Sequence, residues 1–174
     1  MIALVPLANV SPQAVETLLD HAFGPDRRTR TAYRVREGLE PVPELSFAAV
    51  DEDESLIGAI QCWPVELACD DGARVPMVMV GPVAVEPGRQ QGGIGRALMD
   101  RMLDAVAAGG VEGADKLMLV GDPEYYGRFF AFTAERTAGW RLPGPFEARR
   151  LLARGDAVPD CAGMLGPRLA RPAA

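Results

Sequence analysis

The stretch from Gly81 to Met102 constrains the fold of this chain more than any other. It opens within a continuous apolar run, Val78 to Val85, which predicts a buried strand. Glu-Pro-Gly-Arg breaks the run at 86–89, and a glycine-rich turn follows from Gln90 to Gly95. Apolar residues then recur with helical spacing from Ile94 to Ala108, opposite a polar stripe. The stretch therefore predicts a strand, a glycine-rich turn and an amphipathic helix, in that order.

This arrangement is suited to bind an anion. The first N–H groups of a helix have no acceptor within it, and the helix dipole places partial positive charge at the same end. Gly92, Gly93 and Gly95 carry no Cβ, so a phosphate can approach the backbone closely. A P-loop would need Lys and Ser or Thr after Gly95, and a dinucleotide fingerprint would need glycine at Leu98. The spacing fits both motifs poorly, so the turn predicts a phosphate or pyrophosphate site of another kind.

Length and charge narrow the class of protein. The chain has 174 residues, which is enough for one domain with a substantial core. Its formal net charge of −6 argues against a general nucleic-acid binder, which would carry a basic field.

The cysteines and the lone histidine bear on metal sites and on the compartment. Cys62, Cys69 and Cys161 are odd in number and predict no disulfide framework, and no Cys-x-x-Cys pair occurs. With His21 as the sole histidine, we expect no metal site. No signal peptide and no apolar run long enough to cross a bilayer is visible. We therefore expect a soluble protein in a reducing, cytoplasmic setting, with no membrane partner.

The remaining elements alternate with clear turn signals. Ser11 is a predicted helix N-cap with Pro12 in the first turn, and Asp70-Asp71-Gly72 is a hairpin signal. Pro82 lies within a strand, where a missing ladder N–H predicts a bulge or local splay. The expected strands are 2–7, 44–50, 56–68, 74–85 and 116–120, with a final hairpin of 130–134 and 147–153. The expected helices are 12–24, 27–37, 94–108 and 123–129.

The glycine-rich turn resembles motif A of the GNAT superfamily of acyl-CoA-dependent N-acetyltransferases. That motif reads Gln/Arg-x-x-Gly-x-Gly/Ala, and Gln90-Gln91-Gly92-Gly93-Ile94-Gly95 fits it directly after a strand. In the family, backbone N–H groups of this turn hold the pyrophosphate of coenzyme A. The cofactor-binding residues that the resemblance implies are Val83, Ala84, Val85, Gln90, Gln91, Gly92, Gly93, Ile94, Gly95, Arg96, Asp122 and Phe129.

A second segment resembles motif B of one GNAT branch, the YhbS-like predicted acetyltransferases. That branch commonly reads Gly-Asp-Pro-x-Tyr-Tyr-x-Arg-Phe-Gly-Phe, and residues 121–129 read Gly-Asp-Pro-Glu-Tyr-Tyr-Gly-Arg-Phe. The chain departs after Arg128, where Phe129-Phe130-Ala131-Phe132 has an extra residue and no glycine. The tyrosines are unaffected by this departure.

The resemblance implies a fold and a domain organisation. We expect an α/β (α+β) fold of the GNAT type: a mixed, mostly antiparallel central sheet of about seven strands, flanked by helices and splayed between the fourth and fifth strands. The splay would receive the pantetheine arm of the cosubstrate. We expect residues 1–174 to form a single domain, with a flexible tail from about residue 166 to 174.

The resemblance also implies a reaction: transfer of an acetyl group from acetyl-CoA to a primary amine by direct attack. Tyr126 is the first candidate to protonate the departing thiolate and Tyr125 the second, because a phenol is protonated at pH 7. A backbone N–H near Val83 would stabilise the oxyanion. The general base is open, with Glu66 and Glu86 as the local carboxylates, and either is more readily explained as structural.

Several alternatives stay open beside this interpretation. The acceptor is a small-molecule or peptide amine, and a homodimer is compatible with the sequence. The fold could be retained as a non-catalytic acyl-CoA sensor, because the base is unidentified. A weaker alternative is a nucleotide-binding domain that uses the glycine turn. Arg89, Arg96 and Trp63 are further candidates for contacts with phosphate or with the acceptor.

Overall fold

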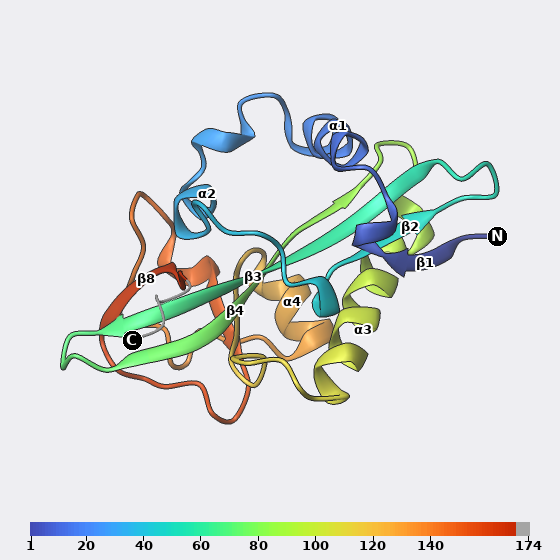
Figure 1. Ribbon diagram of the computed structural model, residues 1–174. Helices are drawn as coiled ribbons and strands as arrows, with labels where there is room; N and C mark the ends of the chain where they lie inside the picture. Colours follow the sequence, from blue (N-terminus) through green and yellow to red (C-terminus); the bar gives the residue numbers. More distant parts are fainter. Residues whose placement is uncertain (170–174) are drawn as a thin grey trace. The chain divides into compact units, whose positions relative to one another are not determined.

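The computed structural model describes residues 1–169, which form two compact units (Figure 1). The first unit comprises Met1–Thr29, Pro41–Cys62 and Val80–Val111. The second comprises Arg30–Glu40, Trp63–Met79 and the chain from Glu112 onward. The two longest strands each contribute residues to both units.

The helices and strands largely follow the predicted order. The strands are β1 Ala3–Pro6, β2 Phe47–Val50, β3 Leu56–Cys69, β4 Arg74–Val85, β5 Leu117–Val120, β6 Trp140–Arg141, β7 Leu151–Arg154 and β8 Gly163–Pro167. The helices are α1 Pro12–Phe23, α2 Thr31–Val35, α3 Ile94–Ala107 and α4 Pro123–Phe130. Short 3-10 helices are η1 Leu7–Asn9, η2 Arg27–Thr29, η3 Pro43–Leu45, η4 Gln90–Gly92 and η5 Ala148–Arg150.

The sheet confirms the predicted fold class. Its strands are hydrogen-bonded in the order β1-β2-β3-β4-β5-β7, and β8 pairs with both β3 and β6. The β1–β2, β2–β3, β3–β8 and β5–β7 pairs are antiparallel, whereas β4–β5 and β6–β8 are parallel. Within residues 1–169 the sheet has eight strands, one more than expected, because β6 and β8 form in segments not predicted as strands and the predicted strand 130–134 does not form.

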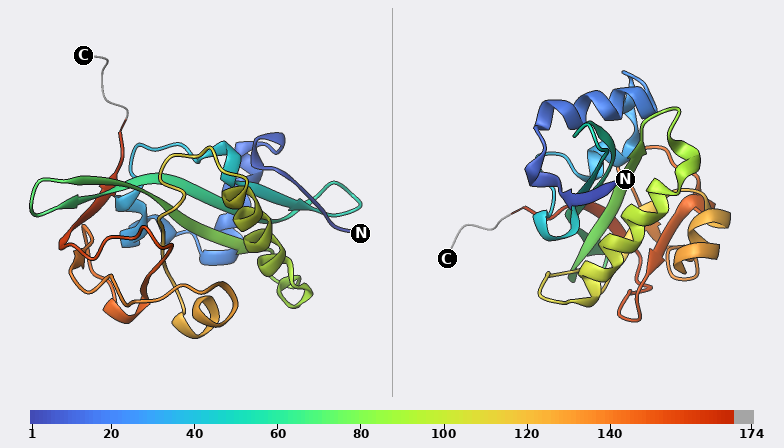
Figure 2. Two further views of the ribbon diagram at one scale, coloured as in Figure 1. Left: turned by 90° about the horizontal axis from the view of Figure 1, so that it is seen from below. Right: turned by 90° about the vertical axis from the view of Figure 1, so that its right-hand side faces the viewer.

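In the first unit, α1 and α3 cover opposite faces of the strands. Ala59 of β3 packs in a buried cluster with Val15, Leu18 and Leu19 of α1. The neighbouring Gly58 faces α3, where an added Cβ would lie 2.8 Å from the Ile94 side chain. Because successive strand residues point to opposite faces, the two helices lie on the two sides of the sheet (Figure 2, right).

The start of α1 forms as its sequence predicts. The Ser11 hydroxyl accepts a hydrogen bond from Ala14 N–H at 3.1 Å, and Pro12 occupies the first turn. The helix ends at Phe23, where Gly24 has a φ of 92° that a side chain would disfavour.

The second unit has its own core, whose strand residues lie on one face of the sheet. β3 pairs with β8 from Val65 opposite Pro167 to Cys69 opposite Gly163, and β4 pairs with β5 through Val78–Leu117 and Met79–Met118. The buried side chains of this core are Val35, Trp63, Val65, Leu67, Cys69, Met77, Met79, Met118, Trp140, Leu142, Leu151, Ala153, Val158 and Leu165.

Arg168 fastens the C-terminal end of this unit to three other segments. Its guanidinium donates to the carbonyl oxygens of Val65, Met77 and Glu112 at 3.1 to 3.2 Å. Its backbone N–H donates to the Pro64 carbonyl oxygen at 3.0 Å. The side chain is mostly buried, so its charge-assisted bonds to Val65 and Met77 are partly shielded from competing water.

The predicted final hairpin is wrong. Phe130 is the last residue of α4, and of the 130–134 segment only Thr133 forms a bridge, with Ala153. The second predicted strand is partly replaced by η5, and β7 pairs along its length with β5, so that it meets the 130–134 segment at the Thr133–Ala153 bridge alone. The physical reason is the helix cap: Ala131 adopts the left-handed conformation (φ 60°) that ends α4, which interrupts the aromatic run before a strand can start.

The predicted tail lies partly within the described residues. Gly166 and Pro167 belong to β8 and Arg168 is bonded as above, whereas residues 170–174 lie outside the described residues. The single-domain organisation of residues 1–174 stays a prediction. Among residues 1–169, no helix combines the length and apolar character needed to cross a bilayer.

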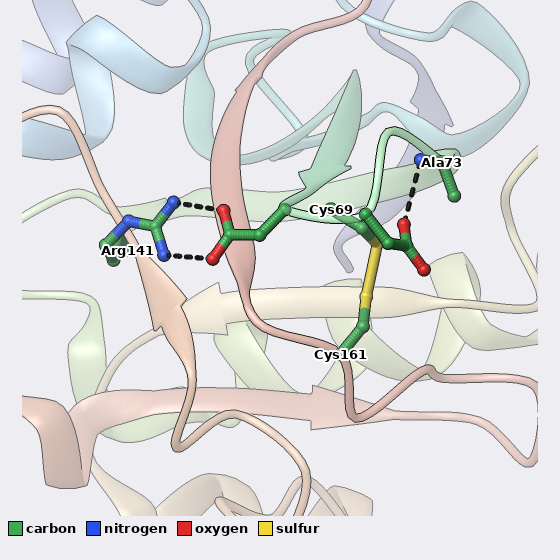
Figure 3. Close-up of a disulfide and its surroundings, with 6 residues drawn as sticks. Cys69, Ala73, Arg141 and Cys161 are labelled. Carbon is green, nitrogen blue, oxygen red and sulfur yellow. Dashed lines mark hydrogen bonds and ion pairs between the residues drawn. A yellow bond between two sulfur atoms is a disulfide. The ribbon is translucent and has the colours of Figure 1, made fainter.

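The sequence predicts no disulfide framework, but the structure contains one disulfide bond. Cys69, at the end of β3, is bonded to Cys161, which precedes β8 (Figure 3). The register of β3 with β8 places Cys69 opposite Gly163, which brings the two cysteines together across 92 residues of sequence. Arg141 donates to both carboxylate oxygens of Asp70 beside the disulfide. Cys62 is the remaining free cysteine and is fully buried.

Reduction of this disulfide is expected to lower the stability of the protein. Closing a loop of this length restricts the unfolded chain, and native disulfides of small proteins typically contribute about 2–4 kcal/mol. Thermal unfolding with and without a dithiol reductant measures the loss. Cys161→Ser should unfold at the temperature of the reduced wild type and should not respond to the reductant. Equal melting temperatures of the oxidised and reduced wild type would contradict this expectation.

Candidate functional site

The glycine-rich turn of the first unit leads into α3 without a side-chain cap. Arg89 N–H closes a turn on the Glu86 carbonyl oxygen, and η4 (Gln90–Gly92) follows. Gly93 is the N-cap of α3 in the left-handed conformation, with φ 74° and ψ 14°, and no side chain caps the helix. The N–H groups of the first helical turn therefore have no acceptor within the helix. This is the backbone arrangement that binds a phosphate group.

The start of α3 is held against β4 by close packing. A Cβ at Gly95 would lie 3.8 Å from Val85 and 4.0 Å from Val83, so these two strand residues face the helix. Ala84, between them, is buried in the cluster that packs on α1. Ile94 is buried, whereas Gln90, Gln91, Gly92, Gly93 and Arg96 are exposed. The structure thus brings together the turn residues predicted for cofactor binding.

The strand before the turn is irregular where Pro82 predicts an irregularity. The Gly81–Pro82 peptide bond is cis, and Gly81 has a φ of 115°, which a residue with a side chain rarely adopts. Val83, the predicted source of an oxyanion-stabilising N–H, follows directly.

Two of the candidate charged residues near the turn are engaged in contacts with other side chains. Glu86 Oε1 lies 2.9 Å from Nδ1 of His21, and the backbone N–H of Glu86 donates to the Ile57 carbonyl oxygen at 2.8 Å. Arg89 lies 3.6 Å from the Asp51 carboxylate. These contacts give Glu86 and Arg89 structural partners within the first unit.

In the second unit, α4 is initiated by its own sequence. The Asp122 carboxylate accepts a hydrogen bond from Glu124 N–H at 3.0 Å, and Pro123 follows at the first helical position. Hydrogen bonding at Glu124 lowers the pKa of Asp122, so the cap is ionised at neutral pH. The cap fixes the first turn of α4, which carries both candidate tyrosines.

Tyr126 lies over Gly121 in a mostly apolar surrounding. A Cβ at Gly121 would come within 2.6 Å of the Tyr126 ring, so glycine leaves the space that the ring occupies. The ring contacts Tyr125, Phe130 and Phe132, with centroids 4.9 to 6.2 Å apart. Burial raises the pKa of Tyr126 to about 12, with a smaller contribution from Tyr125. The phenol is therefore protonated at neutral pH.

Tyr125 and Phe129 form the more exposed side of the same helix. The two ring centroids are 5.4 Å apart, and Phe129 is 37% exposed. The structure thus assembles Tyr125, Tyr126, Asp122 and Phe129 on one short helix, as their spacing predicts.

The second unit also contains contacts that the sequence analysis missed. The Arg36 guanidinium lies 4.0 Å from the ring centroids of both Tyr33 and Trp63, so the cation is stacked between two aromatic faces. Trp63, considered for the acceptor pocket, is therefore part of this stack. Glu66, a candidate base, is paired with Arg74 at 2.8 Å. In the sequence, the only local indication of this arrangement is the basic segment before Arg36.

The sequence analysis also missed the buried Gln61 of β3, which belongs to the first unit. Its side-chain oxygen has no hydrogen-bond partner. A polar residue within the apolar run that precedes Pro64 was the signal that could have identified it. Within the described part of the chain, no group of three or more His, Cys, Asp or Glu side chains is placed to hold a metal ion.

Comparison with solved structures identifies proteins of the same fold. An Escherichia coli GNAT family N-acetyltransferase (YhbS), crystallised with CoA, is 22% identical, with a TM-score of 0.69 over 97% of this chain and 89% of that chain. A Brucella melitensis GNAT family acetyltransferase, crystallised with acetyl-CoA, is 24% identical, with a TM-score of 0.61 over 97% and 96%. A GCN5-related N-acetyltransferase from Kribbella flavida is 21% identical, with a TM-score of 0.53 over 76% and 34%.

Sequence comparison assigns the family. A search of curated proteins finds no significant match. The family model described as an acetyltransferase (GNAT) domain matches residues 9–129, a span that contains β4, the glycine-rich turn, α3 and most of α4. The resemblance seen in the two motifs is therefore confirmed, and the chain belongs to the GNAT family of acetyltransferases.

Proposed function

We propose that the protein is an acyl-CoA-dependent N-acetyltransferase that moves an acetyl group from acetyl-CoA to a primary amine. The observation that carries this proposal is the start of α3 at Gly93, which no side chain caps, in the turn that follows β4. A diphosphate needs several N–H donors, and the exposed turn at 90–93 leads into the first turn of α3, whose N–H groups have no acceptor within the helix. The family and the two neighbours crystallised with CoA and acetyl-CoA support this choice of cosubstrate.

In the proposed reaction, the amine nitrogen attacks the thioester carbon and forms a tetrahedral intermediate. The backbone N–H of Val83 stabilises its oxyanion, because Pro82 has no N–H to offer. When the carbon–sulfur bond breaks, the Tyr126 hydroxyl gives its proton to the thiolate. The amine loses a proton to solvent, directly or through a base. No covalent enzyme intermediate is required.

A second candidate function is a non-catalytic acyl-CoA sensor with the same fold. It is favoured by one observation: Glu66 and Glu86, the carboxylates considered as bases, are both engaged in pairs, with Arg74 and His21. Such a protein would bind acetyl-CoA through the same turn and would not transfer the acetyl group.

Incubation with acetyl-CoA and a panel of primary amines separates the two functions. The panel contains spermidine, kanamycin, a peptide with a free amino terminus and a blocked peptide whose only amine is a lysine. Release of free thiol that depends on one of these amines is expected for the transferase. Tight acetyl-CoA binding without thiol release on any amine would favour the sensor. Thermal stabilisation by ATP but not by coenzyme A would instead favour a nucleotide-binding domain.

A further inference from the structure

Gln61 presents an unpaired hydrogen-bond acceptor inside the first unit. The residue is 6% exposed, and its Oε1 has no hydrogen-bond partner. Nearly all buried polar atoms of folded proteins are paired, because leaving one unpaired gives up the hydrogen bonds that water would make. Such an unpaired atom is explained by a water molecule or a ligand that donates the missing hydrogen bond.

The strand pairing locates Gln61 beside the irregular part of β4. The Glu86 N–H bonds to the Ile57 carbonyl oxygen, and the Cys62 thiol is hydrogen-bonded by the Gly81 backbone. Both contacts belong to the same antiparallel register, which places Gln61 opposite Pro82. The residue after Pro82 is Val83, the proposed oxyanion donor, so Gln61 lies one residue from the level at which the acyl carbon would be held.

The face of the sheet follows from the neighbours of Gln61 along β3. Gly58 faces α3, so Ile60 and Cys62 face α3 as well. Ala59 packs on α1, and Gln61, two residues further on, lies on the same face. The oxygen is therefore on the α1 face, opposite to the face on which Val83 and Val85 contact α3.

We propose that Gln61 Oε1 accepts a hydrogen bond from the reacting N–H of the acceptor and so orients the amine for attack. This inference rests on the proposed N-acetyltransferase function. An amide oxygen offers only lone pairs, so the group that completes it must be an N–H or O–H donor, and the nucleophile of the proposed reaction is such a donor. Burial strengthens the bond, because bulk water is excluded from it.

A hydrogen-bond acceptor without charge at this position also favours the neutral form of the amine, which the reaction needs. A carboxylate would stabilise the ammonium form of the acceptor and raise its pKa, which opposes the loss of the proton. The amide oxygen binds the amine without adding a full negative charge. Gln61 therefore helps to position the amine and leaves its deprotonation unopposed.

Gln61→Met is the main test, since methionine has a similar length and shape and lacks the oxygen. With the amine of the panel on which the wild type is fastest, we expect kcat/KM for the amine to fall about tenfold, the effect of one lost hydrogen bond. The KM for acetyl-CoA should stay at the wild-type value. The melting temperature without substrate should rise, because the unpaired oxygen has been removed. Gln13→Met, at an exposed position of α1, is the matched control and should change none of these values.

Gln61→Glu gives an independent readout. The carboxylate should pair with the ammonium form of the acceptor, so the pH at which kcat reaches half of its plateau should move upward by about one unit. A side chain with a purely structural role would leave this profile in place.

The outcomes separate this inference from the proposed function. If the wild type releases no thiol with any amine, the transferase function fails, and this inference fails with it. If the wild type is active but Gln61→Met keeps the wild-type kcat/KM for the amine, only the role of Gln61 is overturned.

Discussion

Replacement of Gly93 by valine is expected to abolish measurable binding of acetyl-CoA. Gly93 has a φ of 74°, which a β-branched residue adopts only under strain, and no heavy atom lies within 4 Å of the position that a Cβ would take there. The open space is where a diphosphate would approach the first turn of α3, and the valine side chain would fill it. Loss of the charge-assisted hydrogen bonds there should weaken binding at least about 100-fold. Isothermal titration with acetyl-CoA measures the change.

Gly72→Val is the matched control for this experiment. Gly72 also has a positive φ, 97°, and open space around its Cβ position, but it lies in the hairpin turn of the second unit. Both variants carry the same kind of backbone strain, so both should melt at somewhat lower temperatures, and only Gly93→Val should lose binding. Wild-type affinity in a folded Gly93→Val protein would show that the turn does not hold the cosubstrate.

Replacement of Tyr126 by phenylalanine is expected to reduce kcat while leaving the KM for acetyl-CoA nearly unchanged. The hydroxyl is the proposed proton donor to the thiolate, and general acid catalysis typically contributes about 10²–10⁴-fold. The phenylalanine ring retains the packing on Gly121 and Phe132, so the helix should keep its structure. Because the pKa of Tyr126 is raised to about 12 by burial, the wild type keeps this proton up to pH 10. The loss in kcat should therefore be constant between pH 7 and 10, as initial rates of thiol release would show.

Tyr125→Phe is the control for Tyr126→Phe, since both changes remove one hydroxyl from the same helix. The Tyr125 ring contacts the rings of Tyr126, Phe129 and Phe130 in edge-to-face or tilted arrangements, and these contacts do not depend on the hydroxyl. We expect a kcat within about threefold of the wild type, as for a side chain without an acid role. A large loss in Tyr125→Phe together with normal turnover in Tyr126→Phe would exchange the two roles.

The central part of the fold could be predicted because its signals are local. β4, the turn and α3 follow one another directly along the chain, and each change of element coincides with glycine or proline. The Ser11 cap and the Asp122 cap also act within one helical turn. Short-range steric and hydrogen-bonding preferences are therefore sufficient for these elements, and the two motifs that identify the family lie among them.

The C-terminal part could not be predicted for the opposite reason. β6 and β8 are short, and they exist because strands distant in sequence pair with them, such as β3, in which Val65 lies opposite Pro167. The disulfide depends on the same pairing, since only the register of β3 with β8 brings Cys69 near Cys161. The number of cysteines in a sequence does not predict the register of two strands.

The candidate site divides in the same way. The turn at 90–95 and the tyrosines on α4 are readable as motifs, because each function uses neighbouring residues on one element. The stacked Arg36 and the unpaired oxygen of Gln61 are not, because burial and the presence or absence of a partner are tertiary properties. A polar residue within an apolar strand indicates such a position but does not reveal what surrounds it.

The bonds made by Arg168 have a consequence for the order in which the chain matures during translation. Every residue of the first unit has been synthesised once the ribosome has passed Val111. The second unit cannot be completed without β8 and without Arg168, whose guanidinium donates to the carbonyl oxygens of Val65, Met77 and Glu112. The ribosome adds these residues much later. Until Arg168 has been synthesised, the parts of β3 and β4 that belong to the second unit therefore lack the contacts that β8 and the Arg168 guanidinium make with them. A stalled or truncated product that lacks Arg168 exposes these strand segments to chaperones and proteases.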